Sequence, residues 1–168
     1  MYKFLLFVVS LSVATSLSAQ SAAFEDDVLQ IPGVGVVDGA DAAFYSGVEL
    51  LHEGDGVFRL VGGQNHTLVS VEEISIVISP DHTQAAVSVE GFKSNPCVDI
   101  EWPSVSKIGE EFNVVIAESV LGPAESCVAV LDPYTRAVTL ELGGLLAGIY
   151  TVKVNGVSTE FTLDVDAP

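Results

Sequence analysis

Basic residues are scarce in this sequence. Its 168 residues include only 6 Lys and Arg against 23 Asp and Glu, which gives a formal net charge of −17 at pH 7. Nucleic acid and anionic lipid surfaces repel a chain this acidic, so neither is expected as a partner. The charge favours a solvated acidic surface, and it is also compatible with binding of divalent cations.

Sequence motifs for catalysis are missing as well. There is no Gly-x-Ser-x-Gly turn, and the nearest candidate nucleophiles, Ser46 and Ser94, have no supporting motif. The three histidines, His52, His66 and His82, each fall in or beside a predicted turn. We therefore predict that the protein is not an enzyme, has no catalytic residues and needs no cofactor.

Motifs for metal binding are weak. No EF-hand spacing occurs, and the densest group of polar ligands is the stretch 52–56. Asp41, Glu49, Glu53 and Asp55 could bring oxygens together for calcium, which takes about six to eight of them. The sequence predicts no metal site, and a calcium-stabilised surface domain is the alternative that these four residues would support.

Long hydrophobic runs are absent except at the beginning. Lys3 precedes an apolar run over residues 4–9, and small residues follow as far as Ala19. This pattern predicts a signal peptide over residues 1–19, with cleavage after Ala19 or, alternatively, after Ala23. The run is too short for a membrane-spanning helix, which needs about 20 mainly apolar residues. We expect an exported protein, periplasmic or extracellular, with no membrane span after cleavage.

Cysteine is also rare, and Cys97 and Cys127 are the only two. An even pair in an oxidising compartment predicts a disulfide. A redox or metal-binding pair is the competing interpretation, but no Cys-x-x-Cys spacing is present. The sequence therefore predicts a Cys97–Cys127 disulfide.

The apolar residues that are present alternate with a period of two, which predicts an all-β protein. Alternation on both sides of residues 79–83 predicts a hairpin over 74–89, and a change of phase at Glu72 and Glu73 predicts a bulge. Shorter segments precede it, at 29–37, 44–51 and 57–61, with a turn at 53–56. Together they predict a small N-terminal β-meander.

A polar, turn-rich stretch at residues 93–96 suggests a boundary. We expect an N-terminal β-meander unit over 20–92 and a β-sandwich unit over 93–168, although one continuous sandwich is the alternative. The short strands expected in the second unit cover 97–102, 111–118, 126–131, 136–142, 149–155 and 157–165. The predicted fold class is thus an antiparallel β-sandwich preceded by a β-meander.

The last predicted hairpin is the clearest. Asn155-Gly156 separates two alternating runs, which favours a type I′ turn. Residues 143–165 resemble the final strands of immunoglobulin-like and fibronectin-type-III-like modules of exported bacterial proteins, with Ala-Gly-x-Tyr-x-Val before the turn. The resemblance implies an Ig-like C-terminal half in which the Tyr150 hydroxyl bonds back to the main chain. It departs from antibody domains, because Trp102 follows Cys97 closely, so the antibody disulfide and tryptophan are not carried over.

These observations predict an exported, non-enzymatic binding or structural module that acts through loops or a strand edge. The expected partner is a protein or a polysaccharide, and the oligomeric state stays open. Two alternatives remain: a hydrolase or hydrolase inhibitor on a β-sandwich, and the calcium-stabilised surface domain.

Overall fold

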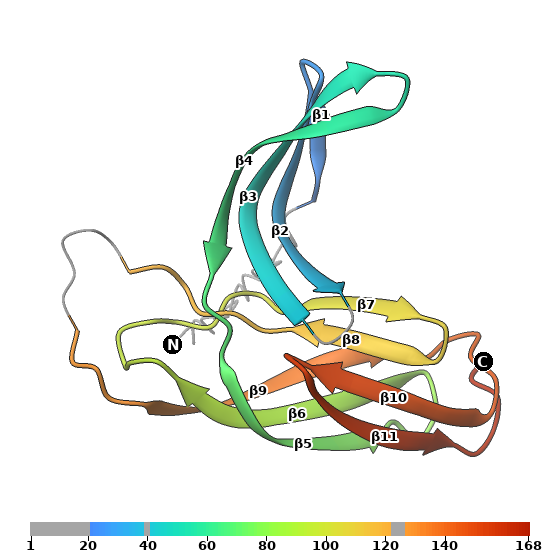
Figure 1. The fold of residues 1–168 in the computed structure, drawn as a ribbon. Helices are drawn as coiled ribbons and strands as arrows, with labels where there is room; N and C mark the ends of the chain where they lie inside the picture. The colour runs from blue at the N-terminus through green and yellow to red at the C-terminus, as the bar shows by residue number, and fades with distance from the viewer. Residues whose placement is uncertain (1–20, 39–40, 122–126) are drawn as a thin grey trace, which may run out of the picture.

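The computed structural model describes residues 21–38, 41–121 and 127–168, and every regular element in them is a β-strand (Figure 1). This confirms the all-β class. The strands are β1 Ala23–Glu25, β2 Val28–Asp38, β3 Asp41–Gly54, β4 Val57–His66, β5 Ser70–Ile78, β6 Gln84–Lys93, β7 Ser104–Ile108, β8 Glu111–Val115, β9 Asp132–Glu141, β10 Gly148–Val154 and β11 Val157–Leu163. The predicted signal peptide, residues 1–19, lies outside the described residues.

The strands form three sheets. Two of them, with strand orders β11-β10-β8-β7 and β5-β6-β9, face each other as a sandwich. The third, β1-β2-β3-β4, is an antiparallel sheet that projects from the sandwich, and we call it the arm (Figure 1). One pair inside the sandwich, β8 with β10, is parallel, whereas the other pairs within the sheets are antiparallel.

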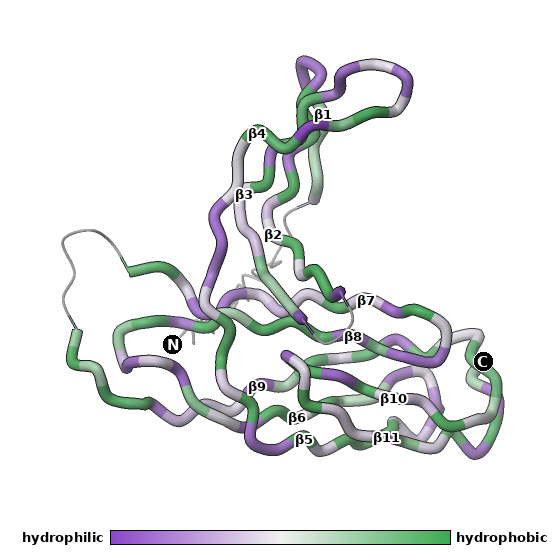
Figure 2. Tube along the Cα trace, viewed as in Figure 1, coloured by the Kyte–Doolittle hydropathy of each residue, from purple (hydrophilic) through white to green (hydrophobic). Residues whose placement is uncertain are grey.

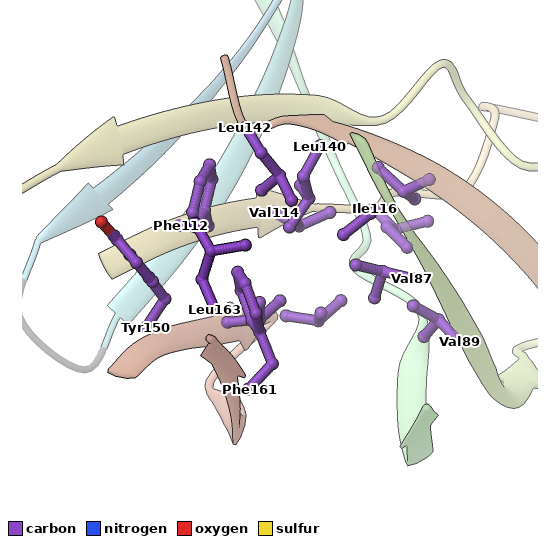
Figure 3. Packing of buried hydrophobic residues seen from close by; sticks show 14 of the residues in the cluster. Val87, Val89, Phe112, Val114, Ile116, Leu140, Leu142, Tyr150, Phe161 and Leu163 are labelled. Carbon is purple, nitrogen blue, oxygen red and sulfur yellow. The ribbon is translucent and has the colours of Figure 1, made fainter. Parts of the chain in front are cut away.

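The core of the protein lies between the two sheets of the sandwich (Figure 3). One side is formed by Val87 and Val89 of β6 with Leu140 of β9, and the other by Val114 of β8 and Val152 of β10, all with almost no exposed surface. Alternate residues of each strand point inward, as the period of two requires. Truncating one such side chain to alanine would cost about 2 to 5 kcal/mol for a Leu or Ile, because the close-packed interior does not refill the space.

Two local predictions are confirmed by the backbone. Asn155 and Gly156 have φ values of 46° and 93° between β10 and β11, as a type I′ turn requires. The predicted bulge is present too, because the register between β5 and β6 shifts between Val71 and Glu73. Asp26 and Asp27 form the turn of the β1–β2 hairpin, with φ of 50° and 62°.

The second half differs from the expected strand list in two places. Residues 97–102 and 127–131 contain no strand, apart from a single bridge at Ile100, and β7 occupies residues 104–108 instead. Extended segments with alternating apolar residues look alike in sequence whether or not a neighbouring strand pairs with them. The expected boundary at residues 93–96 begins on Lys93, the last residue of β6, and this strand pairs with β9 along its whole length. The hairpin β5–β6, placed in the first unit by sequence, therefore supplies two of the three strands in one sandwich sheet.

Candidate interaction surface

The arm is a single layer of sheet over most of its length. Its strands end in two tight turns at the tip, one at Asp26-Asp27 and the other at Asp55-Gly56, and all four of these residues have positive φ. Such two-residue turns match the twist of the flanking strands, which allows β3 and β4 to run on as a long hairpin. Figure 2 shows hydrophobic segments along the arm strands and hydrophilic turns at the tip.

A row of apolar side chains crosses the distal part of the arm. Phe24 pairs with Leu29, Leu29 with Leu50, and Leu50 with Leu60, so the row includes one residue from each of the four strands. Directly paired residues lie on the same face of a sheet. Phe24 and Leu60 at the two ends of the row are 57% and 62% exposed, so no other layer of the described chain covers it.

Two rings extend this face toward the tip. His52 lies between Phe24 and Phe58, with ring centroids 6.3 Å and 5.0 Å apart. We define the distal apolar face by the four residues of the row and these two rings: Phe24, Leu29, Leu50, His52, Phe58 and Leu60.

The same face of the arm is covered at its base. Gly35 lies on β2 at an even spacing from Leu29, and its backbone approaches the sandwich so closely that a Cβ there would lie 2.7 Å from the Cβ of Val115. Phe44, which pairs with Gly35, is buried in a small cluster with Val115 and Ala117. One continuous apolar face is therefore packed on its own sandwich at the base and left bare at the tip.

His66 forms hydrogen bonds that hold the base of the arm to the sandwich. Its Nδ1–H donates to the main-chain carbonyl of Glu118 at 2.7 Å, and its Nε2 accepts from the Ser46 hydroxyl at 2.7 Å. Phe44 packs edge-on against the imidazole. Sequence analysis placed His66 in a surface turn, but it is 93% buried at the end of β4; nothing in its neighbourhood in sequence signals this role.

Ser46 and His66 are also the residues that would serve as nucleophile and base if the protein were a hydrolase. The two are in hydrogen-bond contact, yet Nδ1 of His66 is engaged by a main-chain carbonyl and lies 3.8 Å from the carboxylate of Glu101. Ser94, the other candidate, donates its hydroxyl to the buried Glu118 carboxylate at 2.6 Å. The contacts of both serines tie loops and strands together.

Acidic residues border the distal apolar face but are not part of it. Glu25 ends β1 and is followed by Asp26 and Asp27 in one turn at the tip, and Glu53 and Asp55 lie at the other turn. Over residues 21–66, Arg59 is the only Lys or Arg, and it pairs with Glu53. The arm thus presents an apolar surface with a strongly negative rim.

The structure spreads the four candidate calcium ligands along β3 and the turn that follows it. Asp41 begins the strand at the base of the arm, and Asp55 lies past its other end. A strand rises about 3.3 Å per residue, so these two are about 40 Å apart or more. Glu49 lies between them, and Glu53 bonds to Arg59. In residues 21–38, 41–121 and 127–168 no group of three His, Cys, Asp or Glu side chains is arranged to hold a metal ion.

The disulfide and the tyrosine singled out by sequence both belong to the sandwich. Cys97 and Cys127 are joined, with their Cα atoms 6.1 Å apart, which confirms the predicted disulfide. It ties the loop after β6 to the segment before β9. The Tyr150 hydroxyl donates to the carbonyl of Leu146 at 2.8 Å, which is the bond that the resemblance implies.

Sequence comparison agrees with the class of protein that this architecture defines, a β-sandwich protein. Residues 87–163 match the family described as the ORF11 beta-sandwich domain. The match begins within β6 and ends with β11, so it covers most of the sandwich and leaves out the arm. No curated protein matches the chain, and neither does any solved structure. The part of the chain that the structure describes has no helix long and apolar enough to cross a membrane.

Proposed function

We propose that this chain is an exported, non-enzymatic module that binds another protein with its arm. The observation that carries the proposal is the apolar row Phe24–Leu29–Leu50–Leu60, which ends on residues more than half exposed. Contiguous exposed apolar surface with a polar border is typical of protein interaction sites. The sandwich acts as the platform from which the arm extends.

Three further observations support this reading. β4 is the last strand in its sheet, so one of its edges is free to pair with another chain. The disulfide is typical of proteins that leave the cytoplasm, and the signal-like residues 1–19 point the same way. The Ig-like pattern at 143–165, with the Tyr150 bond, is the pattern of scaffold modules that carry binding surfaces.

The test is affinity capture from the native envelope with two matched variants. Leu60→Glu places a charge on the distal apolar face, and Val77→Glu places one on β5, another edge strand, at a residue that is 68% exposed. We expect the wild type and Val77→Glu to capture the same partner protein, and we expect Leu60→Glu to fail to capture it. Equal capture by all three proteins, or by none, would contradict the proposal.

The hydrolase alternative has one observation in its favour, the 2.7 Å contact between Ser46 and His66. It predicts that a fluorophosphonate probe labels the wild-type protein and fails to label Ser46→Ala. The binding-module proposal predicts no labelling of either protein, because Ser46 then serves only as a hydrogen-bond donor to the buried imidazole.

A further inference from the structure

We propose that the occupant of the arm is an extended polypeptide segment, with alternating apolar residues and a surplus of Lys and Arg, that adds to the free edge of β4. This inference rests on the proposed function and names the chemistry of the partner. It follows from the coincidence of three features on one strand: an unpaired edge, an apolar face and an acidic border.

The first feature defines the kind of ligand. The arm has the order β1-β2-β3-β4, so β4 bonds to β3 on one side and presents main-chain N–H and C=O groups on the other. Among macromolecular ligands, an extended polypeptide strand is the kind whose own alternating donors and acceptors can replace water along the whole of such a row. Residues 57–61 of β4 are all exposed, so the edge is accessible.

The second feature sets the side-chain pattern of the ligand. Leu60 and Phe58 lie on the distal apolar face at the edge of the sheet, 62% and 44% exposed. A fifth strand beside β4 would continue the row Phe24–Leu29–Leu50–Leu60 and cover the outer sides of these two residues. Because side chains of a strand alternate between faces, every second residue of the segment would have to be apolar.

The third feature separates a foreign partner from a second copy of this chain. Pairing β4 with β4 of another copy would place two acidic arms side by side, each with Arg59 as its only Lys or Arg over residues 21–66. Like charges across such an edge disfavour the pairing. A basic segment would find the carboxylate of Asp55 at the neighbouring turn and that of Glu49, which lies against Gly62 of β4, while Arg59 is already neutralised by Glu53. Charge complementarity therefore favours a basic segment.

The experiment uses the full exported chain and a synthetic peptide of about ten residues, the length of β4, with alternating Leu and Lys. A peptide with Glu in place of Lys tests the charge, and one with Pro at every second Leu tests the main-chain bonds, since Pro lacks the N–H. Binding is measured by fluorescence anisotropy at two salt concentrations. We expect the Leu/Lys peptide to bind, binding to weaken with salt, and both control peptides to bind at least about tenfold more weakly.

The two protein variants make the result specific. Leu60→Glu adds a negative charge, so simple adsorption of a basic peptide would be as tight or tighter on this variant. Strand addition beside the distal apolar face predicts instead that Leu60→Glu weakens binding about tenfold or more and that Val77→Glu leaves it unchanged. Equal binding of the peptide to Leu60→Glu and the wild type would overturn the inference.

The remaining outcomes also distinguish this inference from its alternatives. A wild-type protein that is dimeric by light scattering, with a monomeric Leu60→Glu variant, would show that a second copy occupies the edge and would overturn the inference. Failure of the Leu/Lys peptide together with Leu60-dependent capture of a protein from the envelope would reject the basic strand and leave the proposed function standing. Failure of both experiments would remove the proposed function itself.

Discussion

The side chain of Asn155 forms two hydrogen bonds with the main chain of Ile116. Its Oδ1 accepts from the Ile116 N–H at 2.9 Å, and its Nδ2 donates to the Ile116 carbonyl at 2.7 Å. The same Nδ2 donates to the carbonyl of Val69 at 3.0 Å. A turn residue of the last hairpin thus satisfies main-chain groups just beyond β8 and just before β5, at the end of the sandwich near the arm.

Asn155→Gly is expected to destabilise the protein although glycine suits the turn. Glycine adopts the positive φ of residue 155 without strain, so the change removes the side-chain bonds and leaves the backbone preference intact. The Ile116 N–H and the Val69 carbonyl would lose their bonds to residue 155, whereas the Ile116 carbonyl would keep the bond from the Val69 N–H. We expect the change to cost about 1 to 3 kcal/mol. Chemical denaturation measures this free energy of unfolding.

A second variant, Asn155→Asp, tests the two bonds that the Asn155 amide group donates. It retains the shape and the acceptor, but it replaces the two donors with an oxygen that faces the carbonyls of Ile116 and Val69. We expect Asn155→Asp to be no more stable than Asn155→Gly. A free energy of unfolding equal to that of the wild type would show that these bonds contribute nothing.

Sequence patterns predicted the sandwich hairpins better than the arm. Asn155-Gly156 and the phase change at Glu72 and Glu73 are local signals, since φ and strand phase depend on neighbouring residues. The alternation of apolar residues also predicted the meander of β2, β3 and β4, although the strands are longer than expected. Alternation shows which face of a strand is apolar but not which layer covers it, so the bare tip of the arm was not predictable.

The candidate site illustrates the same limit. Leu29, Leu50 and Leu60 are ordinary members of alternating runs, and only the register of three strands aligns them in one row. His66 likewise obtains its role from Glu118, which is distant in the sequence. Long-range pairings of this kind leave no local signal in a single sequence.

Gly35→Ala is expected to loosen the arm from the sandwich. A Cβ at residue 35 would lie 2.7 Å from Val115 Cβ and 2.8 Å from Ser104 Cβ, which is too close for carbon atoms that are not bonded to each other. The backbone of β2 must move away, and such overpacking costs about 1 to 3 kcal/mol. Hydrogen exchange should show faster exchange of amides in β2 and β3.

Two controls accompany this variant. Among the described residues, a Cβ at Gly143 would meet one neighbouring atom, the Pro168 carbonyl oxygen at 3.4 Å, so Gly143→Ala should be tolerated. Val115→Gly removes both Val115 atoms that the new Cβ would meet, Cβ at 2.7 Å and Cγ2 at 2.8 Å, and leaves only Ser104 Cβ close to it. The double variant Gly35→Ala/Val115→Gly is therefore expected to be more stable than the two separate losses would predict when added. Strict additivity would contradict a direct contact between residues 35 and 115.

Reduction of the Cys97–Cys127 disulfide is expected to lower stability by about 3 to 4 kcal/mol, as the loop-entropy model gives for a closed loop of roughly 30 residues. The bond also secures residues 127–131, which belong to no strand. Thermal melts with and without reductant measure the difference. The double variant Cys97→Ser/Cys127→Ser should melt at the lower temperature and should not respond to reductant.

The two buried tyrosines of the sandwich are expected to respond in opposite ways to removal of their hydroxyl groups. Tyr150→Phe loses the bond to Leu146 and should cost about 0.5 to 1.5 kcal/mol. The Tyr134 hydroxyl is buried and has no hydrogen-bond partner among the described residues, so Tyr134→Phe should be neutral or slightly stabilising at pH 7. Paired denaturation curves of the two variants check the contrast.

Tyr134 also predicts how stability depends on pH. Burial raises the pKa of Tyr134 to about 12, from an ordinary value of 10.0, because desolvation disfavours the phenolate. The folded state therefore holds this proton more tightly than the unfolded state. Its contribution is fully present below pH 10 and is lost as the pH rises from about 10 to about 12. Tyr134→Phe should flatten this alkaline loss, whereas Tyr150→Phe should retain it; an unchanged slope in Tyr134→Phe would assign the loss to other groups.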